Sequence, residues 1–234
     1  MPKLGASIIT MDHLNMFQEI QLLKDIGGID YLHVDMMDGH FVPRYGIYPE
    51  IIQEISHRFD FELDVHLMVD DVEFAISQIT GIPNISTISF HYSGNEGRIF
   101  KLIDAVKSLG AKPILAVDLS TSLNAISEIL ESNELSGLLF MGIHPGVLKQ
   151  EHRPANVIRR LNHLSLPSEL SDKLVLQIDG GFNFNTAKEL KISGINSFVG
   201  GSSSIYKGVS ISAQKLERMK LIKSNILTLQ ELWS

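Results

Sequence analysis

The chain has 234 residues, of which 44% are hydrophobic and 20% charged, and it carries a formal net charge of −7. This is an ordinary globular composition, and the length is sufficient to bury a large core in a single domain spanning residues 1–234. The acidic balance and the lack of a dense run of Lys and Arg argue against a nucleic-acid partner. Cysteine is absent, so disulfides and thiolate chemistry are excluded, and a metal would have to bind His, Asp or Glu.

The start of the sequence has no basic segment followed by an apolar stretch. No apolar run reaches the roughly 18 residues of a transmembrane helix. We therefore expect a cytoplasmic protein with no membrane partner.

Short apolar runs alternate with segments of helical periodicity from one end of the chain to the other. The predicted strands are residues 4–9, 31–34, 62–67, 87–91, 113–117, 138–141, 175–178 and 197–199. The predicted helices are residues 14–26, 49–58, 71–79, 97–109, 123–132, 154–164, 184–193 and 212–223. Three helices are followed by a glycine where a left-handed cap is expected, namely Gly27, Gly110 and Gly194.

Eight such units, each of roughly 25 to 30 residues, favour an α/β fold of the (β/α)8 TIM-barrel type. The strands read as continuous apolar runs, which is typical of a parallel sheet covered by helices. A doubly wound open sheet is the competing arrangement.

In a barrel, active-site groups gather at the C-terminal ends of the strands, and residues two apart on a strand share a face. The residues that this rule selects are His33, Asp35 and Met37 on the second strand, Asp64, His66 and Met68 on the third, and Val175, Gln177 and Asp179 on the seventh. If these faces point inward, two imidazoles and two carboxylates converge at one end of the barrel.

Such a set suits Zn, Fe(II), Mn or Co, one divalent ion per subunit, with positions left for substrate oxygens. A lone buried His is more often a hydrogen-bonded core residue. Four such groups together favour a metal, because charges are seldom buried without a partner.

These segments resemble the ribulose-phosphate 3-epimerase family, from about residue 4 to about residue 206. The resemblance is carried by Ser7-Ile8-Ile9, the segment from Leu32 to Pro43, Asp64-Val65-His66-Leu67-Met68-Val69, Phe90-His91, Pro145-Gly146 and Asp179-Gly180-Gly181. It implies that His33, Asp35, His66 and Asp179 bind the metal. It further implies substrate contacts from Ser7, Met37, His66, Met68, Met141 and Gly146, and a homo-oligomer, either a dimer or a hexamer.

The resemblance also implies a phosphate site at the loops after the seventh and eighth strands. Gly180, Gly181, Gly201 and Ser202 lie there, where backbone amides can approach an anion closely. Such glycines serve turns as often as ligands. Their place after these two strands favours the phosphate interpretation.

Epimerisation next to a carbonyl needs a proton to leave from one face and return from the other. We assign the two catalytic roles to Asp35 and Asp179, which must hold one proton between them and titrate as a coupled pair. A metal that bridges O2 and O3 of the sugar would stabilise the cis-enediolate. The methionines would form walls that exclude water without competing for protons.

Several rim positions differ from the usual residues of the family. Arg44 replaces Asn, Tyr48 replaces Gly, and Asp118-Leu119 replaces Asn-Pro after the fifth strand. The segment Val147-Leu148-Lys149 lacks the paired glycines of the family's lid, so we expect a stiffer or differently shaped lid. Arg44 and Lys149 either offer positive charge to a phosphate or sugar acid, or are solvated surface residues.

The leading hypothesis is metal-dependent interconversion of D-ribulose 5-phosphate and D-xylulose 5-phosphate, the reaction that the resemblance implies. The alternatives are 3-epimerisation of another ketose phosphate, such as D-allulose 6-phosphate, and a non-catalytic paralogue that binds a sugar phosphate. A decarboxylase-type barrel needs Asp-x-Lys-x-x-Asp on a strand, and Met37 stands where that Lys would be.

Overall fold

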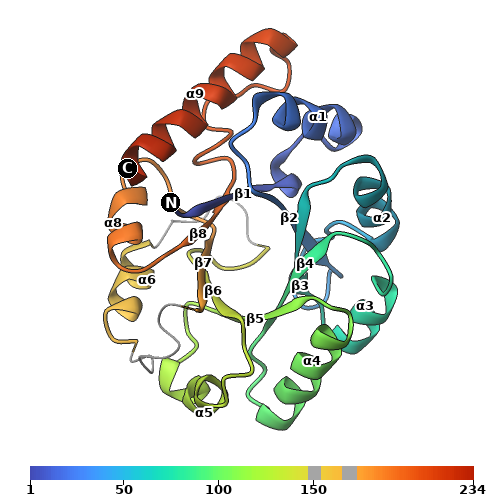
Figure 1. The fold of residues 1–234 in the computed structure, drawn as a ribbon, viewed down its shortest axis with the longest axis vertical. Coiled ribbons are helices and arrows are strands. Elements are labelled where there is room, and N and C mark those ends of the chain that lie inside the picture. The colour runs from blue at the N-terminus through green and yellow to red at the C-terminus, as the bar shows by residue number, and fades with distance from the viewer. Residues whose placement is uncertain (147–153, 165–172) are drawn as a thin grey trace.

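The computed structural model describes residues 1–146, 154–164 and 173–234. Eight parallel strands close into a barrel in chain order, with helices around it (Figure 1). The prediction of a (β/α)8 TIM barrel is therefore confirmed, and the open sheet was the wrong alternative. The predicted lid, Val147 to Lys149, lies outside the described residues.

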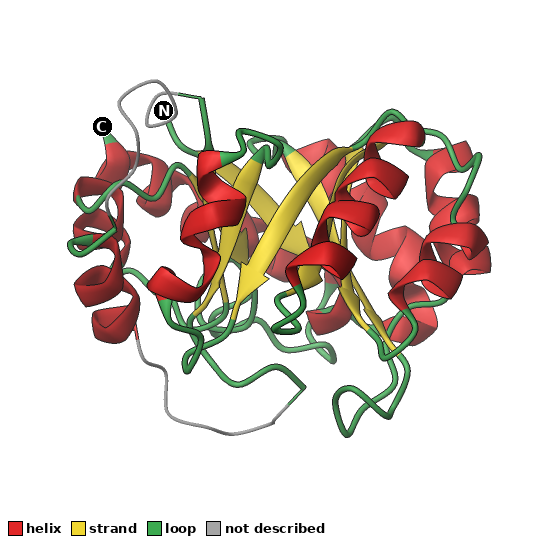
Figure 2. Cartoon of the chain, turned by 90° about the horizontal axis from the view of Figure 1, so that it is seen from below, coloured by secondary structure: helices red, strands yellow, loops and turns green. Residues whose placement is uncertain are grey.

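The strands cross the centre of the molecule, and the helices lie outside them (Figure 2). The strands are β1 (Lys3–Ser7), β2 (Tyr31–Met37), β3 (Glu62–Met68), β4 (Ile85–His91), β5 (Lys112–Val117), β6 (Gly137–Met141), β7 (Val175–Asp179) and β8 (Ser197–Gly200). The helices are α1 (Met16–Ile26), α2 (Pro49–Arg58), α3 (Val72–Gln78), α4 (Glu96–Ser108), α5 (Ser127–Glu131), α6 (Pro154–Leu161), α8 (Ala187–Ile192) and α9 (Lys215–Trp233). Within the described ranges, none of the helices has both the length and the apolar character needed to cross a bilayer.

Side chains on each strand alternate between the helices and the barrel interior. The outward residues, such as Leu32 and Val34 on β2, join the large core between strands and helices. A second, smaller apolar cluster, which includes Ile114 and Leu139, fills one side of the barrel interior. The inward residues of β2, β3 and β7 are mostly polar, and this face carries the site described below.

The N-terminal end of the barrel is closed by the ring of Tyr31. Gly5 pairs with Tyr31 across β1 and β2, and a Cβ at Gly5 would lie only 2.1 Å from that ring. The Tyr31 hydroxyl is 2.8 Å from Ser197 Oγ and accepts a hydrogen bond from Gln177 Nε2 at 2.9 Å. This buried hydroxyl is thus fully hydrogen-bonded, as a polar group in a closed interior must be.

The three glycines predicted as helix caps all have a positive φ, but Gly27, with a ψ of 179°, lies outside the left-handed helical region that was predicted for it. Gly27, Gly110 and Gly194 have φ values of 73°, 78° and 108°, a region that side chains with a Cβ rarely adopt. At the other end of a helix, Asp71 accepts a hydrogen bond from Phe74 N at 2.9 Å and begins α3.

Two corrections to the predicted strand ends bear on the site, and the other strand ends differ from the prediction by at most two residues. Residues 31–34 were predicted as a strand, but β2 continues to Met37, so Asp35 lies within the sheet and pairs with His66 on β3. The predicted strand 4–9 ends at Ser7, where a 3₁₀ turn over Ile8–Thr10 begins.

The last helix was also predicted too short, because residues 212–223 were expected where α9 runs over Lys215–Trp233. Weak helix formers after Lys223 hid its continuation. One face of this helix nevertheless stays apolar, and Ile226 and Leu229 are buried on it.

Trp233 holds the end of α9 against the barrel. Its ring lies 4.6 Å from that of Phe198, and its indole N–H donates to Ala187 O at 3.3 Å. We predict that Trp233→Ala lowers the free energy of unfolding by about 3–5 kcal/mol, because it leaves a cavity. Leu227→Ala, at a 49% exposed position on the same helix, should change it by less than about 0.5 kcal/mol. Equal effects in urea denaturation would contradict this docking.

Candidate active site

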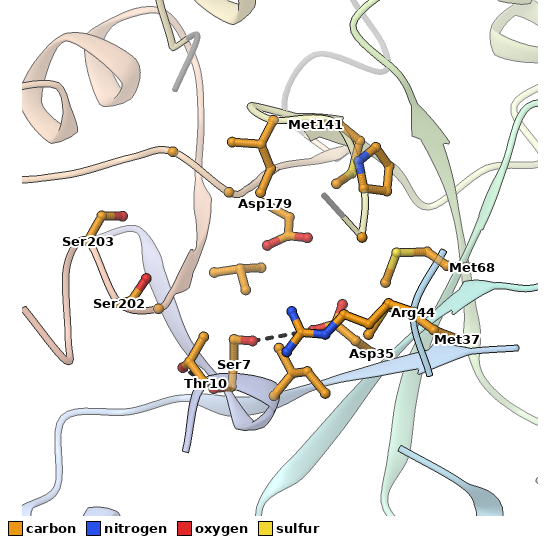
Figure 3. A pocket seen from close by; sticks show the side chains of 18 residues that line it. Ser7, Thr10, Asp35, Met37, Arg44, Met68, Met141, Asp179, Ser202 and Ser203 are labelled. Atoms are coloured by element: carbon orange, nitrogen blue, oxygen red, sulfur yellow. Dashed lines mark hydrogen bonds between the residues drawn. The ribbon is translucent and has the colours of Figure 1, made fainter. Parts of the chain in front are cut away.

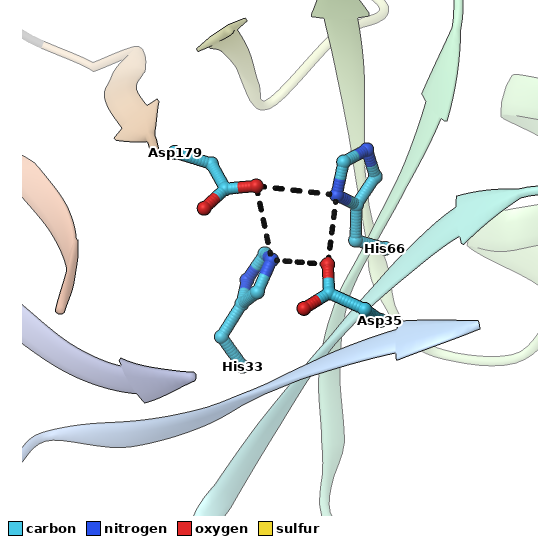
Figure 4. A group of neighbouring side chains, drawn as sticks. All are labelled: His33, Asp35, His66 and Asp179. Atoms are coloured by element: carbon cyan, nitrogen blue, oxygen red, sulfur yellow. Dashed lines mark ion pairs between the residues drawn. The ribbon is translucent and has the colours of Figure 1, made fainter. Parts of the chain in front are cut away.

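Four polar side chains meet at the C-terminal end of the barrel (Figure 4). They come from β2 (His33 and Asp35), β3 (His66) and β7 (Asp179). His33 Nε2 lies 3.3 Å from Asp35 Oδ1 and 3.8 Å from Asp179 Oδ2. His66 Nδ1 lies 3.4 Å and 3.7 Å from the same two oxygens. One ligand atom of each residue lies within 4.8 Å of all the others, so the predicted convergence is confirmed.

The donor atoms of this cluster suit a divalent cation. His33 Nε2 and His66 Nδ1 are buried, yet neither has a hydrogen-bond partner among the described residues. Both atoms face the space between the two carboxylates, where a cation would satisfy all four groups at once. Two imidazole nitrogens and two carboxylate oxygens are ligands that Zn, Fe(II), Mn and Co accept.

The ring of His33 is held by a buried carboxylate on the neighbouring strand. Its Nδ1 lies 2.7 Å from Asp64 Oδ2. Asp64 in turn accepts hydrogen bonds from Thr87 Oγ1 at 2.5 Å and from Gln177 Nε2 at 2.7 Å. With Nδ1 donating to Asp64, the lone pair of His33 Nε2 is left for the cluster. Asp64 and Gln177 had been placed on the inward face by strand alternation, without a role.

The two catalytic candidates differ in protonation. Burial raises the pKa of Asp179 to about 7, and the charge of Asp35 adds to this effect. Burial alone would also raise the pKa of Asp35, but the facing ring of His33 outweighs it and lowers that pKa below its ordinary value. One carboxylate is therefore ionised near neutral pH in the metal-free protein while the other readily holds a proton.

The imidazoles of His33 and His66 have pKa values that are shifted in opposite directions. Burial alone would lower the pKa of His33, but the carboxylates of Asp35 and Asp64 on its two sides raise it well above the ordinary value. Burial lowers the pKa of His66 to about 4, and Asp35 offsets this only in part. Metal binding at this cluster would therefore displace a proton from His33.

A cavity of about 480 Å³ opens above the cluster (Figure 3). Of the residues predicted to contact substrate or phosphate, those that line it are Ser7, Met37, Met68, Met141, Gly146, Gly180, Gly181, Gly201 and Ser202. Asp35 and Asp179 lie on opposite sides of the cavity, and Ser7 Oγ donates to Asp35 Oδ2 at 3.3 Å. His66, also predicted to touch substrate, does not line the cavity and is fully buried.

The predicted phosphate end of the cavity offers free backbone donors. Gly201 N already donates to Ser204 Oγ at 3.1 Å. In the described part of the chain, the amides of Gly181 and Ser202 donate to no protein acceptor. Gly180 has a φ of +78°, and a Cβ there would lie 2.4 Å from Ile143, so a glycine is required next to Asp179.

Arg44, singled out as a departure from the family, lines the same cavity. Its guanidinium extends over the cavity on the side of Ser7 (Figure 3). No hydrogen bond or ion pair joins this guanidinium to another described residue. Among the described lining residues it is the single cationic side chain.

Two polar residues beside the cluster had no predicted role. His91 ends β4, and its Nε2 is 2.9 Å from His66 Nε2. Asp118 follows β5, and its Oδ2 is 3.2 Å from His91 Nδ1. Burial raises the pKa of Asp118, but the bond from His91 and the nearby rings outweigh it and lower that pKa. Their positions at strand ends were a usable signal, because strand ends in a barrel converge.

Comparison with known proteins identifies the family to which this site belongs. The model of the ribulose-phosphate 3-epimerase family matches residues 3–206. The chain belongs to this family. The ribulose-phosphate 3-epimerase of Methanocaldococcus jannaschii is 33% identical over 205 residues, covering 87% of this chain and 84% of that protein. The ribulose-phosphate 3-epimerase of Aquifex aeolicus is 31% identical over 230 residues, covering 97% and 99%. As a member of this epimerase family, the chain is an enzyme of the isomerase class.

Solved structures of other enzymes share the barrel. The 3-hexulose-6-phosphate synthase of Salmonella typhimurium aligns with a TM-score of 0.64 at 16% identity, covering 97% of this chain and 99% of that one. The phosphoribosyl anthranilate isomerase of Thermus thermophilus aligns with a TM-score of 0.64 at 13% identity, again covering 97% and 99%. At such identities the likeness concerns the fold of this family member and not its reaction.

The raised pKa of Asp179 predicts a pH-dependent stability of the metal-free protein. The folded pKa of about 7 exceeds the unfolded value of 3.8, so the stabilisation is complete below pH 3.8 and is lost as the pH rises through 7. We expect Asp179→Asn, which does not titrate, to gain stability relative to the natural protein between pH 5 and pH 8. Thermal melts of both proteins in the presence of a chelator, recorded across this pH range, measure their relative stability. A stability difference between the two proteins that does not change with pH would contradict the prediction.

Proposed function

We propose that this chain interconverts D-ribulose 5-phosphate and D-xylulose 5-phosphate by inverting C3, with a divalent cation bound at His33, Asp35, His66 and Asp179. The observation that carries the proposal is a pair of carboxylates on opposite sides of one cavity, with two buried imidazole nitrogens between them that have no hydrogen-bond partner in the described part of the chain. Membership in the epimerase family supports the reaction type.

Asp35 and Asp179 have the properties that a two-sided proton transfer requires. C3 lies next to the carbonyl carbon, so its proton can leave to a carboxylate on one face. Return of a proton from the carboxylate on the other face then inverts the centre. One carboxylate must be ionised while the other is protonated, and the opposite pKa directions of Asp35 and Asp179 supply this difference. The two residues exchange roles when the reaction runs backwards.

The loss of the C3 proton produces a cis-enediolate, whose negative charge needs stabilisation. A divalent cation held by His33, Asp35, His66 and Asp179 would supply this stabilisation as a Lewis acid, an effect of about several kcal/mol. Zn, Fe(II), Mn and Co all suit the ligand set. His33 and His66 hold their nitrogens toward this position, and Ser7 keeps Asp35 in place through its hydrogen bond.

The walls of the cavity keep water from the reacting carbon. Met37, Met68 and Met141 line it with sulfur and methyl groups, which neither give nor take protons at neutral pH. We assign the sugar phosphate to the opposite end, because Gly181 and Ser202 line the cavity there and their amides donate to no acceptor among the described residues. The homo-oligomer and the cytoplasmic location stay predictions.

One observation favours an alternative substrate for the same reaction. Arg44 and Asp118 differ from the residues that the family usually carries, and Arg44 lines the cavity. A changed side chain at this position would alter which ketose phosphate fits. The second candidate is therefore the same C3 inversion on a longer ketose phosphate, such as D-allulose 6-phosphate.

A substrate panel separates these two candidates. The purified enzyme is analysed for bound metal and then assayed in D₂O with pentulose and hexulose phosphates, with added Zn, Mn, Co or Fe(II). We expect deuterium at C3 of ribulose 5-phosphate together with formation of xylulose 5-phosphate. Faster inversion of the hexulose phosphate would favour the second candidate. Binding without exchange for every sugar would identify a non-catalytic paralogue.

Substitution of either carboxylate tests its catalytic role. Asp35→Asn and Asp179→Asn should each lower kcat by at least ~10²-fold, the usual contribution of a general acid or base. Metal content is measured alongside, because both residues are also assigned as ligands. A variant that binds metal and turns over at nearly the natural rate would remove that carboxylate from the mechanism.

We assign Arg44 to the substrate phosphate, because Arg44 is the single cationic side chain among the described residues that line the cavity, where a phosphate would otherwise face two carboxylates. Arg44→Met should raise KM by about 10- to 100-fold, since a hydrogen bond to a charged group is worth about 1.5–3 kcal/mol, and should change kcat much less. Arg58→Met is the matched control, because Arg58 is exposed on α2 and pairs with Glu54. An unchanged KM in Arg44→Met would place this residue outside the binding site.

A further inference from the structure

A chain of three side chains leads outward from the metal cluster. His66 Nε2 is 2.9 Å from His91 Nε2, and His91 Nδ1 is 3.2 Å from Asp118 Oδ2. The His66 side chain is fully buried, that of His91 is 3% exposed, and that of Asp118 is 31% exposed. The chain thus runs from the buried cluster to the rim of the barrel.

The contact between the two rings is a hydrogen bond, not face-to-face stacking. Their planes are 19° apart and their centroids are separated by 5.0 Å. With the two Nε2 atoms only 2.9 Å apart, nearly parallel rings at this separation must meet edge to edge. One nitrogen therefore donates and the other accepts.

This hydrogen bond fixes the protons along the whole chain. His66 must keep the lone pair of Nδ1 free to bind a cation, so its proton lies on Nε2 and is donated to His91. Nε2 of His91 then has no proton, and its single proton lies on Nδ1. That proton is donated to the carboxylate of Asp118, which completes the only arrangement compatible with two neutral rings.

The surrounding residues hold this chain in place. The ring of Phe41 packs against that of His91 with centroids 4.9 Å apart. Asp38 orders the loop that carries Phe41, because it accepts hydrogen bonds from Phe41 N at 2.9 Å and from Asp70 N at 2.8 Å. On the other side, Arg160 holds the backbone at Asp118 through a bond of 2.7 Å to Asp118 O.

His33 provides an internal comparison. Its Nδ1 meets the carboxylate of Asp64 directly, which leaves Nε2 for the cluster. His66 presents the opposite nitrogen and reaches the carboxylate of Asp118 through His91. Both ring ligands are therefore backed by an acidic group, one directly and one through an intervening imidazole. Hydrogen bonds of this kind orient a ligand and increase its affinity for a metal.

We propose that Asp118 is a positioning residue for the metal centre, acting through His91 to hold His66 with Nδ1 toward the cation and to strengthen it as a ligand. The inference rests on the proposed function, because it requires a cation at the cluster. The carboxylate adds a negative charge that polarises the His91 ring. Asn, the residue usual in the family, would accept the same hydrogen bond without that charge.

The test is the affinity for Zn²⁺, measured by competition with a chromophoric chelator. Asp118→Ala should weaken binding by about 10- to 100-fold, the usual cost of losing such a partner. Asp118→Asn should weaken it less than Asp118→Ala, because it keeps an acceptor for His91 Nδ1. Asp104→Ala removes an acidic residue from an exposed position on α4 and should leave the affinity unchanged.

The outcomes separate this inference from the proposed function. Natural-strength Zn²⁺ binding by both Asp118 variants would overturn the positioning role and leave the metal-dependent function standing. A natural protein that binds none of the four metals would overturn both. Because Arg160 holds Asp118 through its backbone oxygen, both variants keep that bond, and a thermal melt of each metal-free variant confirms that it is folded.

A second measurement reports the protons directly. Long-range ¹H–¹⁵N NMR spectra of the zinc-loaded natural protein should show His66 protonated at Nε2 and His91 protonated at Nδ1. In Asp118→Ala the Nδ1 proton of His91 should lose its slow exchange with solvent. A His91 that carries its proton on Nε2 in the natural protein would overturn the proposal.

Discussion

Asp35 and Asp179 share a buried cluster in which two negative charges cannot coexist without positive charge between them. The metal-free protein meets this constraint with protons, because the pKa of Asp179 is raised and that of His33 is raised as well. A divalent cation would meet it differently, since its charge would take the place of the proton on His33 while Asp35 and Asp179 still share the proton that epimerisation needs. The same property that makes the cluster costly to bury therefore makes it suited to a metal and to proton transfer.

The buried cluster also depends on hydrogen bonds deeper in the barrel interior. Tyr31, Gln177, Asp64 and His33 form a continuous series of hydrogen bonds from the N-terminal end of the barrel up to the cluster. Every member is buried, so loss of one would leave its neighbours without partners. The polar interior of β2, β3 and β7 is thus a support for the ligands, while the apolar interior of β5 and β6 supplies ordinary packing.

Much of this arrangement follows from the sequence, because alternation along strands is local. This alternation alone predicts that His33, Asp35, His66 and Asp179 lie together. The features that the sequence pattern does not predict depend on contacts between distant segments. The role of Asp118 arises only where the ends of β4 and β5 meet, and the length of α9 is set by burial of Trp233 against β8, not by helix propensity. The charge of Arg44 was visible, but its place in the cavity depended on the path of a loop.

The two ring ligands present different nitrogens to the cluster, His33 through Nε2 and His66 through Nδ1. An amide side chain can imitate either atom, but a different one in each case. The amide of Gln reaches as far as Nε2, whereas the shorter amide of Asn reaches only as far as Nδ1. The two histidines are therefore not equivalent positions in evolution. Gln is the substitution that best preserves the position of the ligand atom at residue 33, and Asn is the one that best preserves it at residue 66.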